Sequence, residues 1–110
     1  HETGDELLRH VAGRLRSVVR AADLIGRIGG DEFVVLAEGL NAGDAEAYFQ
    51  RVRAAVDAPY SVGGARLDLT SSLGVVTRAR TLAGSLARAD AAMYRAKERG
   101  GGVELDGEPD

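Results

Sequence analysis

Apolar residues recur at the spacing of an α-helix in three stretches of the chain. The three stripes consist of Leu8, Val11, Leu15 and Val18, then Ala45, Phe49, Val52 and Val56, and finally Leu86, Ala89, Met93 and Ala96. Thr3 with Glu6 three residues later matches a capping box for the first helix, and Asn41 matches an N-cap for the second. The pattern therefore predicts helices over about residues 5–19, 42–58 and 82–99.

Short apolar runs lie between the predicted helices and indicate strands. Runs over residues 23–28 and 33–37 flank Gly29-Gly30, which we expect to form the tight turn of a hairpin. A second hairpin is expected around Gly63-Gly64, and its outgoing strand continues toward Val76. The order helix, two strands, helix, strands, helix predicts an α+β fold with the helices on one face of an antiparallel sheet.

Length and composition narrow the class of protein. The 110 residues suit one domain, and the 45% hydrophobic and 28% charged residues are ordinary for a globular chain. The formal charge of −3 argues against a nucleic-acid-binding protein, which would usually be basic. The chain has no cysteine, which excludes disulfides and suits a cytosolic compartment without excluding export. No apolar run approaches the ~20 residues that span a bilayer.

Two adjacent acids, Asp31 and Glu32, follow the expected turn glycines. Aspartate is depleted in strands, and neighbouring carboxylates repel each other unless a cation lies between them. Carboxylates beside a backbone without side chains suit a Mg²⁺-bound phosphate, because the oxygens hold the metal and the glycines let the phosphate approach. Residues 29–32 are therefore a candidate metal and phosphate site, and the alternative is a hairpin turn with two solvated acids.

Four ordered blocks of the sequence resemble one known family. They are His1-Glu-Thr-Gly-Asp5 with Leu8, Arg27-Ile-Gly-Gly-Asp-Glu-Phe33, Ser72-Leu-Gly-Val75, and Ala89-Asp-Ala-Ala-Met-Tyr-Arg-Ala-Lys97. The second block is similar to the signature of GGDEF domains, the diguanylate cyclases, and the other three resemble further stretches of that family. Together they cover essentially the whole chain, which is far more specific than the signature alone.

The resemblance implies a ferredoxin-like βαββαβ palm with an antiparallel sheet, as in nucleotidyl cyclases and polymerases. Residues 1–102 would be the C-terminal three quarters of the GGDEF domain, and residues 103–110 a last short strand and an acidic tail. In the family, another strand and helix precede the position of His1, and that first strand lies between the third and fourth. Its absence here predicts open strand edges, an uncovered apolar face and a chain that is a poor catalyst by itself.

The resemblance also implies an activity, which is the condensation of two GTP molecules into cyclic di-GMP with release of two pyrophosphates. The reaction needs Mg²⁺ (or Mn²⁺) and a homodimer, because each subunit holds one GTP. Members of the family act in bacterial second-messenger signalling and usually carry an upstream sensory domain. We therefore expect a cytoplasmic domain, with any membrane anchor in an upstream region, and no nucleic-acid partner.

Site residues carry over from the family where the motifs match. Asp31 would be the metal and catalytic carboxylate, and Glu32 would support the metal or activate the attacking hydroxyl. Gly29 and Gly30 would lie near the phosphates. Asp5 would contact the guanine edge, although an acid in the first turn of a helix is also favoured by the helix dipole.

The last predicted helix carries the remaining substrate contact. Lys97 matches a phosphate-contacting lysine, and its alternative role is a solvated lysine at a helix C-terminus. The family usually continues with Gly-Arg-Asn, whose arginine also contacts phosphate. Gly100-Gly-Gly102 stands there instead, so we expect weaker triphosphate binding, with Arg99 as a candidate replacement.

An Arg-x-x-Asp motif, Arg20 to Asp23, lies upstream of the signature at the spacing of the family's inhibitory site for cyclic di-GMP. An arginine fork suits phosphate or a guanine edge, and an aspartate suits the N–H groups of guanine. Arg51 lies where the family often supplies a further arginine. The alternatives are a salt bridge at a helix-to-strand turn and an exposed helix arginine. For the domain as a whole, two other functions stay open: a cyclic di-GMP or GTP binding module without turnover, and a plain interaction domain.

Overall fold

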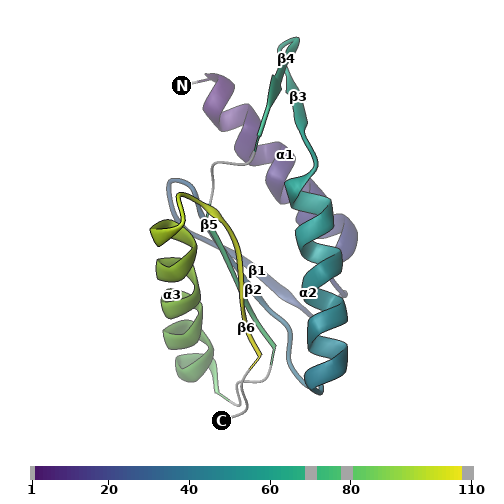
Figure 1. Ribbon diagram of the computed structural model, residues 1–110, viewed down its shortest axis with the longest axis vertical. Helices are drawn as coiled ribbons and strands as arrows, with labels where there is room; N and C mark the ends of the chain where they lie inside the picture. Colours follow the sequence, from purple (N-terminus) through teal and green to yellow (C-terminus); the bar gives the residue numbers. More distant parts are fainter. Residues whose placement is uncertain (1, 69–71, 78–80, 108–110) are drawn as a thin grey trace.

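The computed structural model describes residues 2–68, 72–77 and 81–107 (Figure 1). Three helices and six strands follow one another in these ranges. Their order is α1 Glu2–Val18, β1 Leu24–Gly29, β2 Glu32–Leu36, α2 Ala42–Asp57, β3 Tyr60–Val62, β4 Ala65–Leu67, β5 Ser72–Val76, α3 Leu82–Glu98 and β6 Gly102–Asp106. No helix among the described residues is long and apolar enough to cross a bilayer.

Four strands form the central sheet in the order β1-β2-β5-β6, and β3 with β4 forms a separate hairpin. The pair β1/β2 is antiparallel, whereas β2/β5 and β5/β6 are parallel. Phe33, Leu73 and Val103 lie side by side across β2, β5 and β6. This four-stranded sheet with its helices is compatible with the palm-like fold of the resemblance, so the predicted fold class is confirmed.

Two details of the predicted sheet differ from the structure. The sheet is mixed rather than antiparallel, because β5 and β6 are joined through α3 and a helical crossover connects parallel strands. The strands β2 and β5 correspond to the third and fourth strands of the palm, and the resemblance predicts open edges between them. That expectation is wrong, because β2 pairs directly with β5 from Glu32 to Leu36. The edge strand β1 nevertheless leaves Leu24 and Ile28 exposed.

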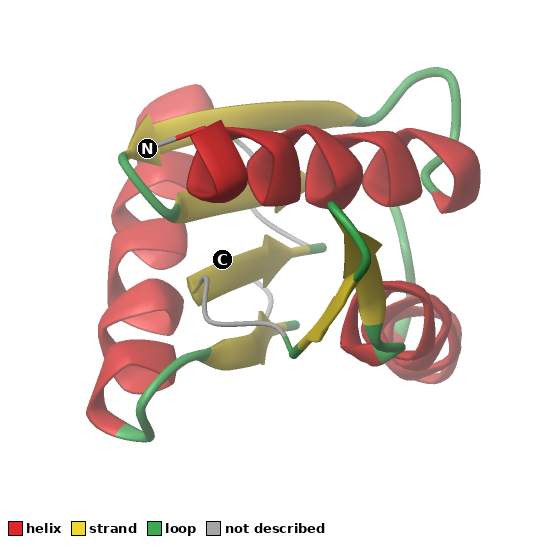
Figure 2. Ribbon diagram, turned by 90° about the horizontal axis from the view of Figure 1, so that it is seen from above, coloured by secondary structure: helices red, strands yellow, loops and turns green. Residues whose placement is uncertain are grey.

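Helices cover both faces of the sheet, not one as predicted. Figure 1 shows α3 on one side and α2 on the other, and Figure 2 shows the same arrangement from above. The larger core joins residues of α1, α2 and the sheet, among them Leu15, Val52 and Leu73. A smaller cluster on the α3 face contains Val34, Val76 and Ala89. Helices lie on both faces because alternate residues of β2 are apolar on each side, and the whole of β5 is buried.

Close packing of α3 on the sheet depends on one glycine. A Cβ atom at Gly74 of β5 would lie 2.8 Å from the carbonyl oxygen of Ala89 on α3. The contact is with backbone, which cannot rotate away, so the absence of a side chain sets the distance between helix and strand. The Ser72-Leu-Gly-Val75 block therefore has a packing role.

Helix boundaries agree with the sequence pattern at several points. Asn41 caps α2, and its side chain accepts a hydrogen bond of 2.8 Å from the backbone nitrogen of Asp44. Gly100 follows α3 with φ of 86°, as expected for a residue just past a helix end. The predicted cap at Thr3 is misplaced, because α1 already begins at Glu2. The predicted strand through residues 69–71 lies outside the described residues.

The apolar stripes of all three helices are wrong by one residue. On α1 the buried residue is Leu7, and the predicted Leu8 is only partly buried. On α2 the buried aromatic residue is Tyr48, and the predicted Phe49 is only partly buried. On α3 the predicted Leu86 is 45% exposed, whereas Ser85 is buried. In each helix both alternatives preserve helical spacing, so the hydrophobic pattern alone could not distinguish them.

Candidate functional site

The signature residues form the end of the β1–β2 hairpin. The turn consists of Gly30 and Asp31 rather than the predicted two glycines, and Gly29 pairs with Glu32 across the hairpin. Arg27 donates to the carbonyl oxygen of Gly30 from Nε at 3.1 Å and from Nη2 at 2.6 Å. The hairpin end is thus held by an arginine of its own signature.

Glycine at position 29 leaves room for the Glu32 side chain. A Cβ atom at Gly29 would lie 1.8 Å from Oε1 of Glu32. Glu32 in this position forms an ion pair of 2.6 Å with Nζ of Lys97, near the end of α3. The hydrogen bond to Glu32 raises the pKa of Lys97, and the negative charge of Asp31 acts in the same direction.

Three predicted site residues therefore meet at one edge of the molecule. Asp31 is exposed in the turn, Glu32 begins β2, and Lys97 reaches them from α3. The described residues contain no group of three or more histidine, cysteine or acidic residues that could enclose a metal ion. Mg²⁺ is usually bound by one or two carboxylates together with substrate phosphates and water. Asp31 and Glu32 fit a cation that arrives with a phosphate.

Asp5 belongs to a different surface, a groove between α1 and the β1–β2 hairpin with a volume of about 820 Å³. The groove is lined at one part by Asp5, Leu8 and Phe33, and at another by Arg20 and Asp23. Asp5 is exposed on the first turn of α1. No hydrogen bond or ion pair links Asp5 to residues 29–32 in the part of the chain that the structure describes. The groove nonetheless places Asp5 on one surface with Arg27 and Phe33 of the signature.

The Arg-x-x-Asp motif forms a closed unit at the turn before β1. The carboxylate of Asp23 accepts hydrogen bonds from Arg20 backbone nitrogen at 2.8 Å, Nε at 3.0 Å and Nη2 at 2.8 Å. Its side chain is only 1% exposed. Burial alone would raise the pKa of Asp23, but hydrogen bonds from Arg20 and Tyr48 outweigh it and hold that pKa below its ordinary value.

Tyr48 completes this unit and was missed by the sequence reading. Its hydroxyl donates to Oδ2 of Asp23 at 2.6 Å. The guanidinium carbons of Arg20 and Arg51 lie 5.7 Å and 5.5 Å from the centre of its ring. Burial and the bond to Asp23 raise the pKa of Tyr48. The structure therefore brings together Arg20, Asp23 and Arg51 around Tyr48. In the sequence, only the position of Tyr48 between Ala45 and Val52 on the helical stripe indicates that it is buried.

The segment after α3 departs from the family pattern in its backbone as well as its residues. Gly101 and Gly102 both have φ of 110°, a conformation that an arginine would adopt only with strain. Arg99 does not take the place of the absent arginine here, because its Nη2 donates to Val103 at 2.9 Å and pairs with Glu104 at 2.9 Å. Lys97 is then the cation that α3 places at the acidic turn.

Comparisons with known proteins agree with the motifs. A sequence model described as diguanylate cyclase, GGDEF domain, matches residues 1–102. The diguanylate cyclase DgcP of Pseudomonas aeruginosa is 41% identical over 91% of this chain and 15% of its own length. The response regulator PleD of Caulobacter vibrioides is 42% identical over 91% of this chain and 23% of its own length. The bifunctional diguanylate cyclase/cyclic di-GMP phosphodiesterase MucR of Pseudomonas aeruginosa is 38% identical over 91% of this chain and 15% of its own length.

The chain spans less than a quarter of the length of each of these three relatives. The match nevertheless extends over nearly all of this chain and includes the signature hairpin, α1 and α3. The resemblance inferred from four sequence blocks is thereby confirmed. The chain belongs to the diguanylate cyclase GGDEF domain family.

Proposed function

We propose that this domain condenses two GTP molecules into cyclic di-GMP and releases two pyrophosphates. The observation that carries this proposal is the hairpin end with Asp31 and Glu32, held beside Lys97 of α3. Two carboxylates and one ammonium group at an exposed glycine turn suit the binding of a nucleoside triphosphate better than a purely structural role in the hairpin. Family membership supports the same reaction class.

Each residue of the hairpin site has a role in this proposal. Asp31 and Glu32 would hold Mg²⁺ (or Mn²⁺), which neutralises phosphate charge and aligns the attack when it is bound. Lys97 leaves Glu32 and donates to a phosphate oxygen. Gly29 and Gly30 allow the phosphates to approach the backbone. In the alternative role for Glu32, Asp31 is the metal ligand, and the Glu32 carboxylate accepts the proton of the attacking hydroxyl once Lys97 has left it.

Asp5 would select the base. A carboxylate accepts two N–H hydrogen bonds from a guanine edge, and adenine does not offer that pair of donors. Asp5 is exposed and shares its groove with Leu8, whose half-buried apolar side chain suits the face of a base.

The reaction needs two subunits. The 3′-hydroxyl of each GTP attacks the α-phosphorus of the other, a new phosphodiester bond forms, and pyrophosphate leaves from each. One domain binds one GTP, so the productive state is a homodimer whose hairpin ends face each other. An upstream sensory domain would control that approach, and the domain itself would act in the cytoplasm.

Product inhibition is the regulatory part of the proposal. Cyclic di-GMP would bind at Arg20, Asp23 and Arg51, which lie together around Tyr48 of α2. Two guanidinium groups suit the phosphodiesters of this ligand. Substituting alanine for Arg20 should then relieve inhibition, and unchanged affinity for cyclic di-GMP would remove the site.

GTP binding measured by calorimetry with and without Mg²⁺ tests the hairpin site. Asp31→Asn should lose most of the Mg²⁺-dependent part of the affinity, because one of two metal ligands becomes neutral. Glu38→Gln is the matched control, since Glu38 is an exposed acid just beyond the other end of β2. Equal Mg²⁺ dependence in wild type and Asp31→Asn would refute the assignment.

A binding module without turnover is the second candidate, and two observations favour it. Glu32 is engaged by Lys97, and the glycine segment after α3 lacks the arginine that the family usually has there. Chromatographic analysis of the products separates the two functions, because a module would bind GTP or cyclic di-GMP and leave GTP intact.

A further inference from the structure

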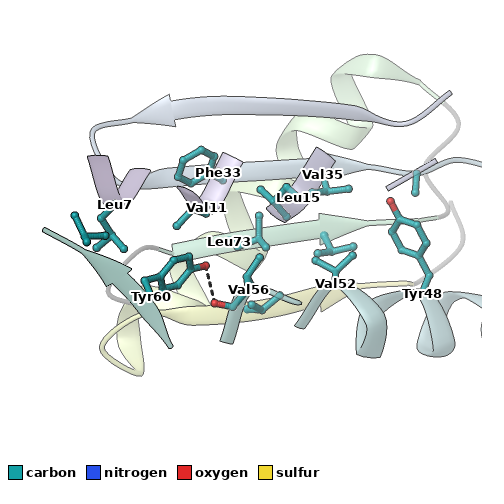
Figure 3. Packing of buried hydrophobic residues seen from close by; sticks show 14 residues of the cluster. Leu7, Val11, Leu15, Phe33, Val35, Tyr48, Val52, Val56, Tyr60 and Leu73 are labelled. Carbon is teal, nitrogen blue, oxygen red and sulfur yellow. Dashed lines mark hydrogen bonds between the residues drawn. The ribbon is translucent and has the colours of Figure 1, made fainter. Parts of the chain in front are cut away.

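Tyr48 lies at the centre of the Arg20, Asp23 and Arg51 unit, and no motif of the sequence assigns it a role. It is 1% exposed and lies at one end of the buried cluster, with Tyr60 at the other end (Figure 3). Its hydroxyl and its ring have separate partners. The hydroxyl donates to Asp23, and the ring lies near both arginines.

The Arg20 side chain is held in place by hydrogen bonds, but some of its N–H groups remain unused. Its Nε and Nη2 donate to Asp23, and Nη2 also donates to the carbonyl oxygen of Glu38 at 2.9 Å. A guanidinium carries five N–H groups, so the two on Nη1 remain for a ligand. The side chain of Arg20 is 42% exposed, so part of it is accessible to solvent.

Asp23 links Tyr48 to Arg20 and holds the Arg20 side chain in place. Both of its oxygens already accept hydrogen bonds, from Arg20 and from the Tyr48 hydroxyl. With 1% of the side chain exposed, an N–H group of a ligand would have to displace one of these donors first. The groups of this unit that still have unused donors are therefore the arginines, which suit phosphate oxygens or a guanine edge.

Arg51 depends on the ring more strongly than Arg20 does. It is exposed on α2, three residues after Tyr48, and its contact among the described residues is the ring face. A cation over an aromatic ring is attracted by the negative face of the ring. The ring can therefore hold Arg51 on the same side of α2 as the open edge of Arg20.

We propose that Tyr48 is a positioning residue, which holds Arg20 through Asp23 and Arg51 through its ring as a pair of cations for a cyclic dinucleotide. This inference rests on the proposed inhibitory site. The Tyr48 hydroxyl fixes the orientation of the Asp23 carboxylate, and that carboxylate fixes the Arg20 side chain. The Tyr48 ring holds the Arg51 guanidinium beside that of Arg20. Ligand binding then needs less ordering of two flexible side chains.

The chain offers a matched control for this role. Tyr60 is also buried and also carries an arginine over its ring, since Arg14 lies 3.6 Å from the ring centre. Tyr60→Leu removes a buried tyrosine and a cation–π contact far from Arg20 and Arg51. Its effect on stability should resemble that of Tyr48→Leu, whereas its effect on the arginine pair should be nil.

The test is calorimetric titration of cyclic di-GMP into the full chain and its Tyr48→Phe, Tyr48→Leu and Tyr60→Leu variants, with thermal denaturation of each. Two lost cation–π contacts should weaken the affinity of Tyr48→Leu about tenfold. Tyr48→Phe keeps the ring and should stay within about threefold of wild type, the size of one modest hydrogen bond. Equal loss in Tyr48→Leu and Tyr60→Leu would show a purely structural role and overturn the proposal.

A readout without ligand separates this inference from the inhibitory function. The Nε–H signal of Arg20 in ¹H–¹⁵N NMR should exchange slowly in wild type and Tyr60→Leu, and faster in both Tyr48 variants. If this holds and wild type does not bind cyclic di-GMP, the positioning role stands and the inhibitory function is refuted. Unchanged exchange of Arg20 Nε–H in both Tyr48 variants would overturn the positioning role, whatever the ligand does.

Discussion

Arg14 of α1 connects that helix to the end of α2, and its removal is the sharpest test of how the helical layer is held. Its guanidinium donates to the carbonyl oxygens of Ala55 at 3.1 Å and Pro59 at 2.6 Å, and also to that of Ala58. It lies 3.6 Å from the ring centre of Tyr60. A cation is favoured here because the last carbonyl groups of a helix carry partial negative charge.

Arg14→Met keeps the length of the side chain and removes the charge and the donors. Three hydrogen bonds from a charged but partly exposed group contribute about 1 kcal/mol each at most, and the contact with Tyr60 about 1 kcal/mol. The expected loss in the free energy of unfolding is about 2–4 kcal/mol. In a domain of this size, that loss lowers the melting temperature by roughly 10–20 °C.

Urea denaturation followed by circular dichroism measures this loss directly. Arg9→Met is the control, because Arg9 is an exposed arginine on the same helix. We expect Arg9→Met to remain within about 0.5 kcal/mol of wild type, as is usual for surface substitutions. If Arg14→Met is no less stable than Arg9→Met, Arg14 does not join α1 to α2.

Three further predictions concern the packing of α3 on the sheet, the stability of the fold at acid pH, and the contact of Lys97 with phosphate. Gly74→Ala should lower the free energy of unfolding by about 1–3 kcal/mol, measured with urea, because its Cβ would meet the Ala89 carbonyl oxygen. The pKa of Asp23 is lowered on folding, so its stabilisation is present above about pH 4 and is lost as the pH falls through the folded value; the urea midpoint of Asp23→Asn should therefore change less than that of wild type below pH 4. Lys97→Met should raise the KM for GTP about tenfold, the size of one charge-assisted hydrogen bond, and an unchanged KM would exclude Lys97 from phosphate binding.

Much of the fold could be predicted from the spacing of apolar residues and from turn residues. Three helices, the hairpin of the signature and the Asn41 cap follow from local rules, because each depends on neighbours in sequence. The direct pairing of β2 with β5 could not be predicted in this way. It depends on which strands become neighbours in three dimensions, and the family pattern places another strand between them.

The candidate site was predictable where a motif names its residues. Lys97 is distant in sequence from Asp31 and Glu32, and the family blocks predict one site for all three, in agreement with the ion pair between Lys97 and Glu32. The contacts of Tyr48 could not be predicted, because a tyrosine on a helical apolar stripe indicates only a buried core residue. Its hydroxyl and ring acquire partners only when α2 packs beside the turn before β1.

The central claim is that the Asp31 hairpin makes cyclic di-GMP from GTP, and its most direct test is the product itself. The protein is incubated with GTP and Mg²⁺, and the products are resolved by chromatography. We predict one cyclic di-GMP and two pyrophosphates for every two GTP consumed, and loss of this product in Asp31→Asn but not in Glu38→Gln. Cyclic di-GMP formed at the same rate by Asp31→Asn, or GTP left intact by the wild-type protein, would contradict the claim.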